Sequence, residues 1–261
     1  MVDVVKEHML SILKKGKRSD ARGFEDFREI KIEYNISKSA EGSAKVSIGD
    51  TEVIAGVKLE LTEPFPDTPD EGGIMINVEL RPMSSPDFEL GPPSHEAIEL
   101  SRVVDRAIRE GHALDFKKLC LKKGESCWMV IIDIYPVNDA GNLFDAAGLA
   151  AMAALQETKF PKIEENNVVN YKESSGKKLP LKAMPLCCTV VKIGDYFIVD
   201  PDNEEEKEVD AKLVVGILED GNLCSMQKTG EMGLDANELE KMVDLAIKKT
   251  KELRKVLSKW N

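Results

Sequence analysis

The chain has 261 residues, with 36 Lys and Arg against 47 Asp and Glu, so its formal net charge is −11. Hydrophobic residues make up 42% of it and charged residues 32%, a composition that excludes intrinsic disorder and predicts a sizeable core. No window approaches the run of about 18 apolar residues of a membrane span, and charges interrupt the N-terminal apolar pattern, unlike a signal peptide. We therefore expect a cytoplasmic protein, and the acidic balance argues against one that coats nucleic acid by itself.

The residue types that often carry chemistry are few and scattered. The three histidines (His8, His95 and His112) lie far apart in the sequence, and we expect each at the surface. The five cysteines form no Cys-x-x-Cys pair and stand in apolar runs typical of reduced, buried thiols, so we expect neither a disulfide framework nor a zinc site. They are Cys120, Cys127, Cys187, Cys188 and Cys224.

The first part of the chain predicts one helix and three strands. Apolar residues at helical spacing before Gly16 predict an amphipathic helix over about 2–15, with a buried face made of Val2, Val5, Met9, Ile12 and Leu13. A polar, basic stretch over 17–28 follows. Alternating apolar residues over 44–48 and 53–61 flank Gly49-Asp50 and predict a β-hairpin, and 74–80 predicts a further strand.

The central part predicts two helices around a strand. A loop rich in Pro, Ser and Gly over 81–93 precedes an amphipathic helix over 94–110, and 128–134 alternates as a strand. Residues 146–155 are almost all small, which predicts a buried helix with close backbone packing and with Asp145 as its N-cap.

The second half repeats part of the first. Ile-Gly-Asp at 48–50 recurs at 193–195, both times between two strand patterns, which predicts a duplicated unit with halves over about 17–157 and 180–261. Asp220-Gly221 predicts another hairpin, and Asp235 with Glu238 forms a predicted capping box for a long C-terminal helix. Strands and helices thus alternate in one α/β domain spanning 1–261.

An acidic run over 200–206, followed by Asp210, is one candidate site. Carboxylates that follow a strand can bind a metal ion or act as acid or base. A solvated loop is the other interpretation, and charge runs are more often merely exposed.

The helix over 94–110 carries the second candidate site. At 100° per residue, Arg102, Arg106 and Arg109 fall within an arc of about 60°, opposite the apolar face. Three guanidinium groups projecting together suit phosphate oxygens. The alternative is an exposed face with intrahelical ion pairs from Glu99 to Arg102 and from Asp105 to Arg109.

Several segments together resemble the RNase PH-like family, and within it the non-catalytic ring subunits of the archaeal exosome. The resemblance runs from about residue 16 to the C-terminal helix. It rests on 17–23 (KRSDARG), 28–30 (REI), 42–44 (GSA), 51–57 (TEVIAGV), 91–93 (GPP), 99–106 (ELSRVVDR), 141–147 (GNLFDAA) and 199–201 (VDP).

Two departures from the catalytic members point to an inactive subunit. Those members hold the attacking phosphate with Gly-Thr-Arg or Gly-Ser-Arg, where this chain has Gly141-Asn142-Leu143. Leucine offers no donors to an oxyanion. The catalytic members also carry a pair of aspartates after the Asp-Pro strand exit; this chain keeps Asp210 but has glutamates over 204–206 instead of the first aspartate.

The resemblance implies an RNase PH-like fold (ribosomal protein S5 domain 2-like), with two pseudo-repeated βαβα-type halves, mixed sheets and a long C-terminal helix. It implies no catalytic residue and no cofactor in this chain. A catalytic homologue would supply the phosphate site and alternate with this chain in a hexameric ring, a trimer of heterodimers, that degrades single-stranded RNA from its 3′ end beneath RNA-binding cap subunits. It allows a divalent metal in the complex.

The resemblance also favours the RNA-binding interpretation of the arginine helix. Arg102 and Arg106 match its motif positions, and Arg109 is added from helical geometry. Two alternatives stay open. One is an exoribonuclease active by itself through a metal held by Glu204, Glu206 and Asp210. The other is an assembly scaffold that does not contact RNA.

Overall fold

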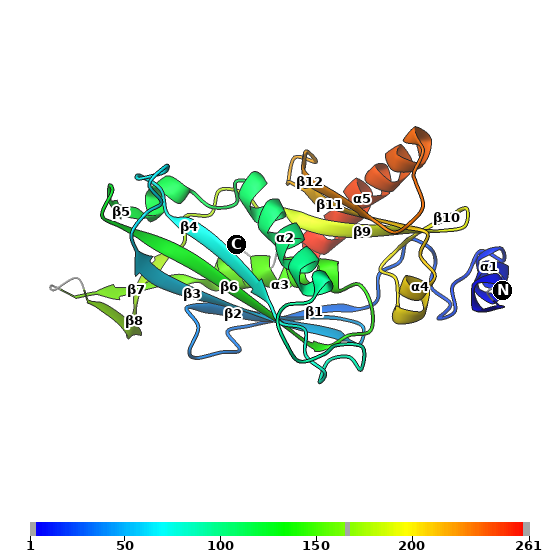
Figure 1. The fold of residues 1–261 in the computed structure, drawn as a ribbon, viewed down its shortest axis with the longest axis horizontal. Helices are drawn as coiled ribbons and strands as arrows, with labels where there is room; N and C mark the ends of the chain where they lie inside the picture. Colours follow the sequence, from blue (N-terminus) through cyan, green and yellow to red (C-terminus); the bar gives the residue numbers. More distant parts are fainter. Residues whose placement is uncertain (1–3, 165–167, 258–261) are drawn as a thin grey trace.

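Two β-sheets with one buried helix between them organise the molecule in the computed structural model, which describes residues 4–164 and 168–257 (Figure 1). The elements up to the buried helix are α1 (Val4–Leu13), β1 (Ile30–Tyr34), β2 (Gly42–Ile48), β3 (Thr51–Thr62), β4 (Gly73–Val78), α2 (His95–Glu110), η1 (Phe116–Leu119), β5 (Cys120–Lys122), β6 (Ser126–Asn138) and α3 (Leu143–Glu157). Those that follow are β7 (Lys159–Ile163), β8 (Val169–Lys178), β9 (Leu186–Ile193), β10 (Tyr196–Val199), α4 (Asn203–Lys207), β11 (Ala211–Ile217), β12 (Leu223–Thr229) and α5 (Ala236–Leu257).

The first sheet is mixed and the second is antiparallel. The first has the order β1-β2-β3-β6-β4, with β5 also paired to β6, and only β4 runs parallel to its neighbour. The second has the order β10-β9-β11-β12. α3 packs against β2 and β3 on one side and β9 on the other, while α2 packs against the edge strands β4 and β12. The chain is thus the α/β fold with mixed strands that the sequence predicted.

The predicted hairpins are present at the predicted turns. Gly49 joins β2 to β3 with a φ of +55°, and Gly194 joins β9 to β10 with a φ of +59°, a region that glycine enters without steric cost. Both Ile-Gly-Asp sequences therefore form the same kind of turn. That the halves arose by duplication stays a prediction.

The small residues of α3 let it lie close to both sheets. Every residue from Phe144 to Gln156 is buried, and a Cβ added at Gly148 would come 3.4 Å from the Cβ of Cys187 on β9. The predicted N-cap is wrong. The helix begins at Leu143 after Asn142, which has a left-handed φ of +60°, and Asp145 lies inside the first turn, 1% exposed. Thr189 and Asn142 both donate hydrogen bonds to the buried carboxyl of Asp145, which offsets part of the cost of its burial.

The ends of the chain follow the predicted pattern with one difference. The capping box of α5 is confirmed, since Glu238 donates its backbone N–H to Asp235 Oδ1 at 2.8 Å and accepts one in return at 3.1 Å. α1 covers only Val4–Leu13, Val2 lies outside the described residues, and Val5 is 55% exposed. α1 therefore packs on the second sheet mainly through Leu13, with Met9 and Leu10 beside it.

Several elements were not predicted from the sequence. β1, β5, β7 and β8 were not predicted, and the acidic run contains the short helix α4. The three histidines are exposed, as predicted. Cys127, Cys187 and Cys188 are buried thiols, whereas Cys120 and Cys224 are only half-buried. No helix within the described ranges is long and apolar enough to cross a bilayer.

Candidate functional site

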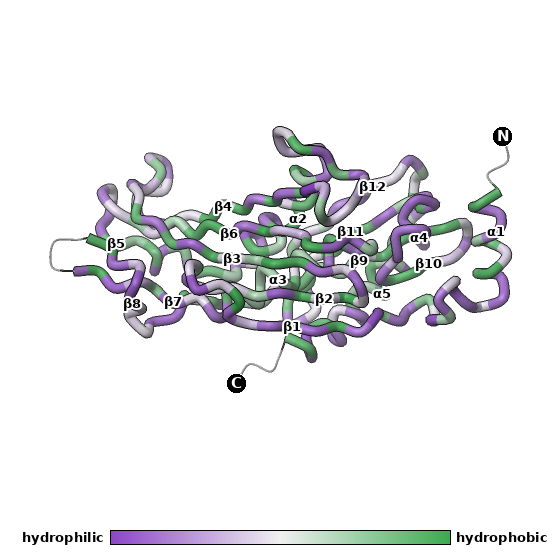
Figure 2. Tube along the Cα trace, turned by 90° about the horizontal axis from the view of Figure 1, so that it is seen from below, coloured by the Kyte–Doolittle hydropathy of each residue, from purple (hydrophilic) through white to green (hydrophobic). Residues whose placement is uncertain are grey.

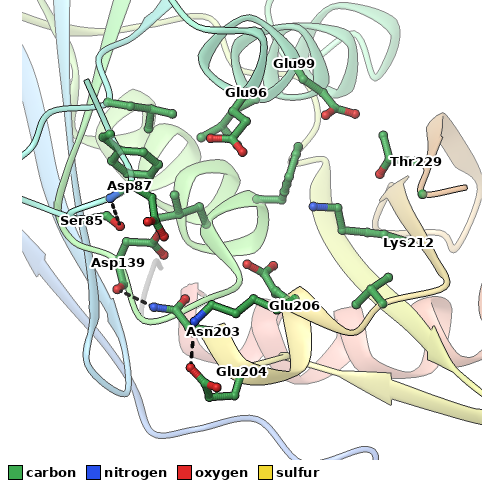
Figure 3. A pocket seen from close by; sticks show the side chains of 18 of the residues that line it. Ser85, Asp87, Glu96, Glu99, Asp139, Asn203, Glu204, Glu206, Lys212 and Thr229 are labelled. Carbon is green, nitrogen blue, oxygen red and sulfur yellow. Dashed lines mark hydrogen bonds and ion pairs between the residues drawn. The ribbon is translucent and has the colours of Figure 1, made fainter. Parts of the chain in front are cut away.

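A pocket of about 530 Å³ opens between the N-terminal half of α2, the start of α3 and α4 (Figure 3). Its apolar lining includes Leu100, Leu143 and Phe144. Leu143 is the residue that stands where the resemblance places a phosphate-binding arginine in catalytic family members. The pocket is therefore where this chain departs from the phosphate-binding motif of the catalytic members.

Carboxylates dominate the polar lining of this pocket. Two lysines, Lys207 and Lys212, face six acidic residues: Asp87, Glu96, Glu99, Asp139, Glu204 and Glu206. Burial raises the pKa of both Asp139 and Glu206, which shows how poorly water solvates their charges. A phosphate entering the pocket would thus be repelled by negatively charged side chains.

The two lysines do not reverse this balance. Lys207 pairs with Glu204 at 2.9 Å. The ammonium of Lys212 lies 4.5 Å from the centroid of the Phe144 ring and points into the pocket near Glu206 (Figure 3). Neither side chain offers the planar fork of donors with which arginine holds a phosphate.

Behind the pocket, two half-buried arginines hold the buried strand exit at Asp200, and we call this group the arginine clamp. Arg28 donates to both carboxylate oxygens of Asp200, at 2.9 and 2.7 Å, and also to the carbonyls of Ala140 and Gly141. Arg22 adds an ion pair to Asp200 at 2.7 Å. Burial alone would raise the pKa of Asp200, but the hydrogen bonds and charge of Arg28 outweigh it and hold that pKa below its ordinary value. The clamp thereby ties the loop before α3 to the strand exit.

A second buried pair anchors α4. Arg18 binds both carboxylate oxygens of Glu205 and the backbone carbonyls of Val199 and Asp200. Glu205 also completes a capping box with Asp202. Both charged side chains are nearly inaccessible, 0% exposed for Arg18 and 2% for Glu205.

These contacts correct the interpretation of the acidic run as a solvated loop. Asp200 and Glu205 are buried and paired, and Asp210 accepts a 2.6 Å hydrogen bond from Lys6 and another from the backbone of Gly194. Among the residues that the structure describes, no three His, Cys, Asp or Glu side chains converge as metal ligands. Glu204, Glu206 and Asp210 are therefore not brought together.

The arginine face of α2 lies farther along the same helix. Arg102 is exposed and forms no hydrogen bond or ion pair with any described residue. Arg106 donates to Gln227 on β12 at 3.0 Å. Arg109 instead binds both carboxylate oxygens of Asp105, the intrahelical pair of the alternative interpretation, and the carbonyl of Ile74. Arg102 and Arg106 remain available to a ligand, and they share a shallow pocket of about 180 Å³.

The other expected ion pair on this helix is not formed. Glu99 accepts from Gln227 rather than pairing with Arg102. Gln227 thus links Arg106 and Glu99 across α2 and β12, a contact that sequence reasoning could not find because β12 is distant in sequence. The same holds for Arg18, Arg22 and Arg28, whose only signal was a basic stretch in an acidic chain.

Comparison with known proteins decides the family. Residues 26–161 match the family model "3′ exoribonuclease family, domain 1", and residues 183–249 match domain 2 of the same family. The chain belongs to the 3′ exoribonuclease family. The RNase PH-like fold inferred from the motifs is thereby confirmed.

Relatives within the 3′ exoribonuclease family are similar over nearly their full length. "Exosome complex component Rrp42" of Methanosarcina acetivorans is 48% identical over 251 residues, which cover 95% of this chain and 91% of the relative. The protein of the same name from Methanothermobacter thermautotrophicus is 42% identical over 98% of this chain and 95% of its own length.

Solved structures agree with this assignment. A chain from the structure "Archaeoglobus fulgidus exosome with RNA bound to the active site" superposes with a TM-score of 0.89 at 42% identity, covering 97% of this chain and 98% of that one. Rrp46 from rice has a TM-score of 0.66 at 17% identity, covering 92% of this chain and 97% of that one, and shares the fold.

Proposed function

We propose that this chain is a catalytically inactive, RNA-positioning ring subunit of an archaeal exosome, a phosphate-dependent 3′-to-5′ exoribonuclease. Its relatives are named as exosome components, and one similar structure is of an exosome with RNA in its active site. A catalytic RNase PH-like homologue alternates with this chain in a hexameric ring, with RNA-binding caps above. The chain itself holds no cofactor, and phosphate is consumed at the partner's site.

The main support for an inactive chain is the acidic lining of its pocket. Phosphorolysis requires an inorganic phosphate placed for attack, and this pocket presents six carboxylates and Leu143 where an anion would have to sit. Like charges within a few ångströms repel most strongly where burial excludes water. The residues present do not fit phosphate.

The metal-dependent alternative has less support. It needs Glu204, Glu206 and Asp210 around one ion, and in the structure Asp210 is committed to Lys6 and Gly194 while Glu204 pairs with Lys207. Without an activity of its own, this chain would serve to stabilise the partner's active site and to hold RNA. Arg102 and Arg106 are the residues available for that second task.

The first test compares the activity of the isolated chain with that of the chain in complex with its catalytic homologue. We expect the isolated chain to release no nucleoside diphosphate from single-stranded RNA in the presence of phosphate, and the chain co-purified with its catalytic homologue to do so processively. Chromatographic detection of the released diphosphates measures both. Phosphate-dependent release by the isolated chain would contradict the proposal and would make the acidic pocket a catalytic site.

Removal of the two available arginines tests RNA positioning. In the assembled complex, Arg102→Ala with Arg106→Ala should weaken RNA binding by about tenfold to a hundredfold at low salt. Each phosphate contact contributes about 0.7 to the slope of log affinity against log salt for single strands, so the slope should fall by about 1.4. Fluorescence anisotropy over a salt series measures both quantities.

A matched variant controls for the loss of positive charge. Lys14→Ala with Lys15→Ala removes two exposed charges at the end of α1 and should leave RNA affinity unchanged. If the double arginine variant also bound RNA normally at every salt concentration, the chain would be an assembly scaffold without RNA contact.

A further inference from the structure

The β7–β8 hairpin stands apart from the two main sheets. Its strands form a two-stranded sheet of their own, outside both main sheets. In Figure 1 it projects at the end of the molecule opposite to α1. Residues 162–182, which include the whole of β8, fall between the two matched family domains. The hairpin therefore lies at the junction between the two matched domains.

Its charge is opposite to that of the rest of the chain. Residues 159–182 contain six lysines and three glutamates, a formal charge of +3 within a chain of −11. Figure 2 shows hydrophilic residues along much of β8, and every residue from Tyr171 to Lys178 is exposed. Folding gains little from burial here, so this composition is not explained by packing.

The lysines of the hairpin lie close together. Lys159 on β7 and Lys178 on β8 are direct cross-strand partners. The side chains of Lys159 and Lys172 form no ion pair with any residue that the structure describes. Lys162, by contrast, pairs with Glu173 at 2.9 Å. The charges of Lys159 and Lys172 are therefore open to a polyanion alongside the ribbon.

Aromatic rings lie among these charges. Tyr171 is 50% exposed, and the ammonium of Lys58 on β3 lies 5.1 Å from its ring centroid. Lys177 lies over the ring of Phe160 at 5.9 Å. Basic groups that track phosphates, together with an exposed ring on which a base can stack, are the two components of sequence-independent single-strand binding.

We propose that the β7–β8 hairpin is a second contact for single-stranded RNA, separate from the arginine face of α2. Lys159, Lys172 and Lys177 bind the phosphate backbone and Tyr171 stacks with a base. The choice of RNA as the polyanion rests on the proposed function. This contact lengthens the stretch of RNA that the complex holds without adding sequence preference.

The test uses the assembled complex and a three-residue variant, Lys159→Gln, Lys172→Gln and Lys177→Gln. Binding of a single-stranded RNA of about 30 nucleotides should weaken about threefold to tenfold at low salt, and the salt slope should fall by about 2. The matched control Lys14→Gln, Lys15→Gln and Lys17→Gln removes three exposed charges at the opposite end and should change neither. With the parent complex, photo-crosslinking to RNA containing 4-thiouridine should label the peptide that contains Tyr171.

Each result decides a different question. Normal affinity of the hairpin variant, with no crosslink at Tyr171, would overturn this inference while the arginine variant still tests the proposed function independently. Weaker association with the catalytic subunit, with unchanged RNA affinity, would also overturn it and make the hairpin a protein-docking surface. Loss of affinity in the hairpin variant together with the Tyr171 crosslink would establish the second contact even if Arg102 and Arg106 proved dispensable.

Discussion

Replacement of Arg18 by alanine is expected to lower the free energy of unfolding by about 3–5 kcal/mol, because it leaves an uncompensated charge in the interior. Glu205 is 2% exposed, and Arg18 supplies two charged donors to its carboxylate, which otherwise accepts only the backbone N–H of Asp202 among the described residues. Arg18 also satisfies the carbonyls of Val199 and Asp200, which the variant leaves without these donors. Chemical denaturation of the purified chain measures the loss.

A second substitution separates the charge from the lost packing. Adding Glu205→Gln to Arg18→Ala removes the buried charge and keeps an acceptor for the α4 cap, so stability should recover in part. Lys31→Ala breaks an exposed pair with Glu29 of ordinary length, 2.9 Å, and should cost less than about 0.5 kcal/mol. Equal costs for the Arg18 and Lys31 variants would show that burial of the Arg18–Glu205 pair has no energetic consequence.

The contribution of Asp145 to stability should fall as pH rises from about 4 to about 7. Burial raises the pKa of Asp145 from its ordinary value of 3.8 to about 7, with the hydrogen bonds from Thr189 and Asn142 offsetting only part of the effect. Between these values the folded chain holds a proton that the unfolded chain has released, so this stabilisation is complete below pH 4 and lost above pH 7. A pKa difference of about 3 corresponds to about 4 kcal/mol.

The variant Asp145→Asn isolates this carboxyl from other buried acids. Asp139 and Glu206 also have raised pKa values and contribute with the same sign, so the informative quantity is the difference between parent and variant. That difference should be small at pH 4 and should favour the variant by several kcal/mol at pH 8, measured by denaturation across the series. Asp244→Asn, on the exposed side of α5, should follow the parent curve. Parallel curves for parent and Asp145→Asn would mean that the buried carboxyl is ionised throughout.

Hydrophobic periodicity and turn chemistry determined most of the framework. The hairpin at Gly49, the small-residue helix α3, the amphipathic α2 and the capped α5 all depend on neighbours within a few residues, and all were predicted. The strands β7 and β8 were missed because their residues are mostly polar or exposed and carry no alternation. β1 does alternate, with Ile30, Ile32 and Tyr34 on one face, but its five residues are too short a run to stand out beside the basic stretch before it. The motif set in turn sufficed for the family, since it spans the chain and each part lies within a few consecutive residues.

What only the tertiary structure decided is the role of each charge. The sequence placed an acidic run after a strand and arginines near the N-terminus, but not that Arg18 and Arg28 would bury Glu205 and Asp200. The sequence also left Arg102, Arg106 and Arg109 equivalent on one helix face. In the structure, Arg109 is distinguished because it donates hydrogen bonds to Asp105 and to the carbonyl of Ile74 on β4. The partners of Arg18, Arg28 and Arg106 lie more than a hundred residues away in the chain, and local pattern carries no information about them.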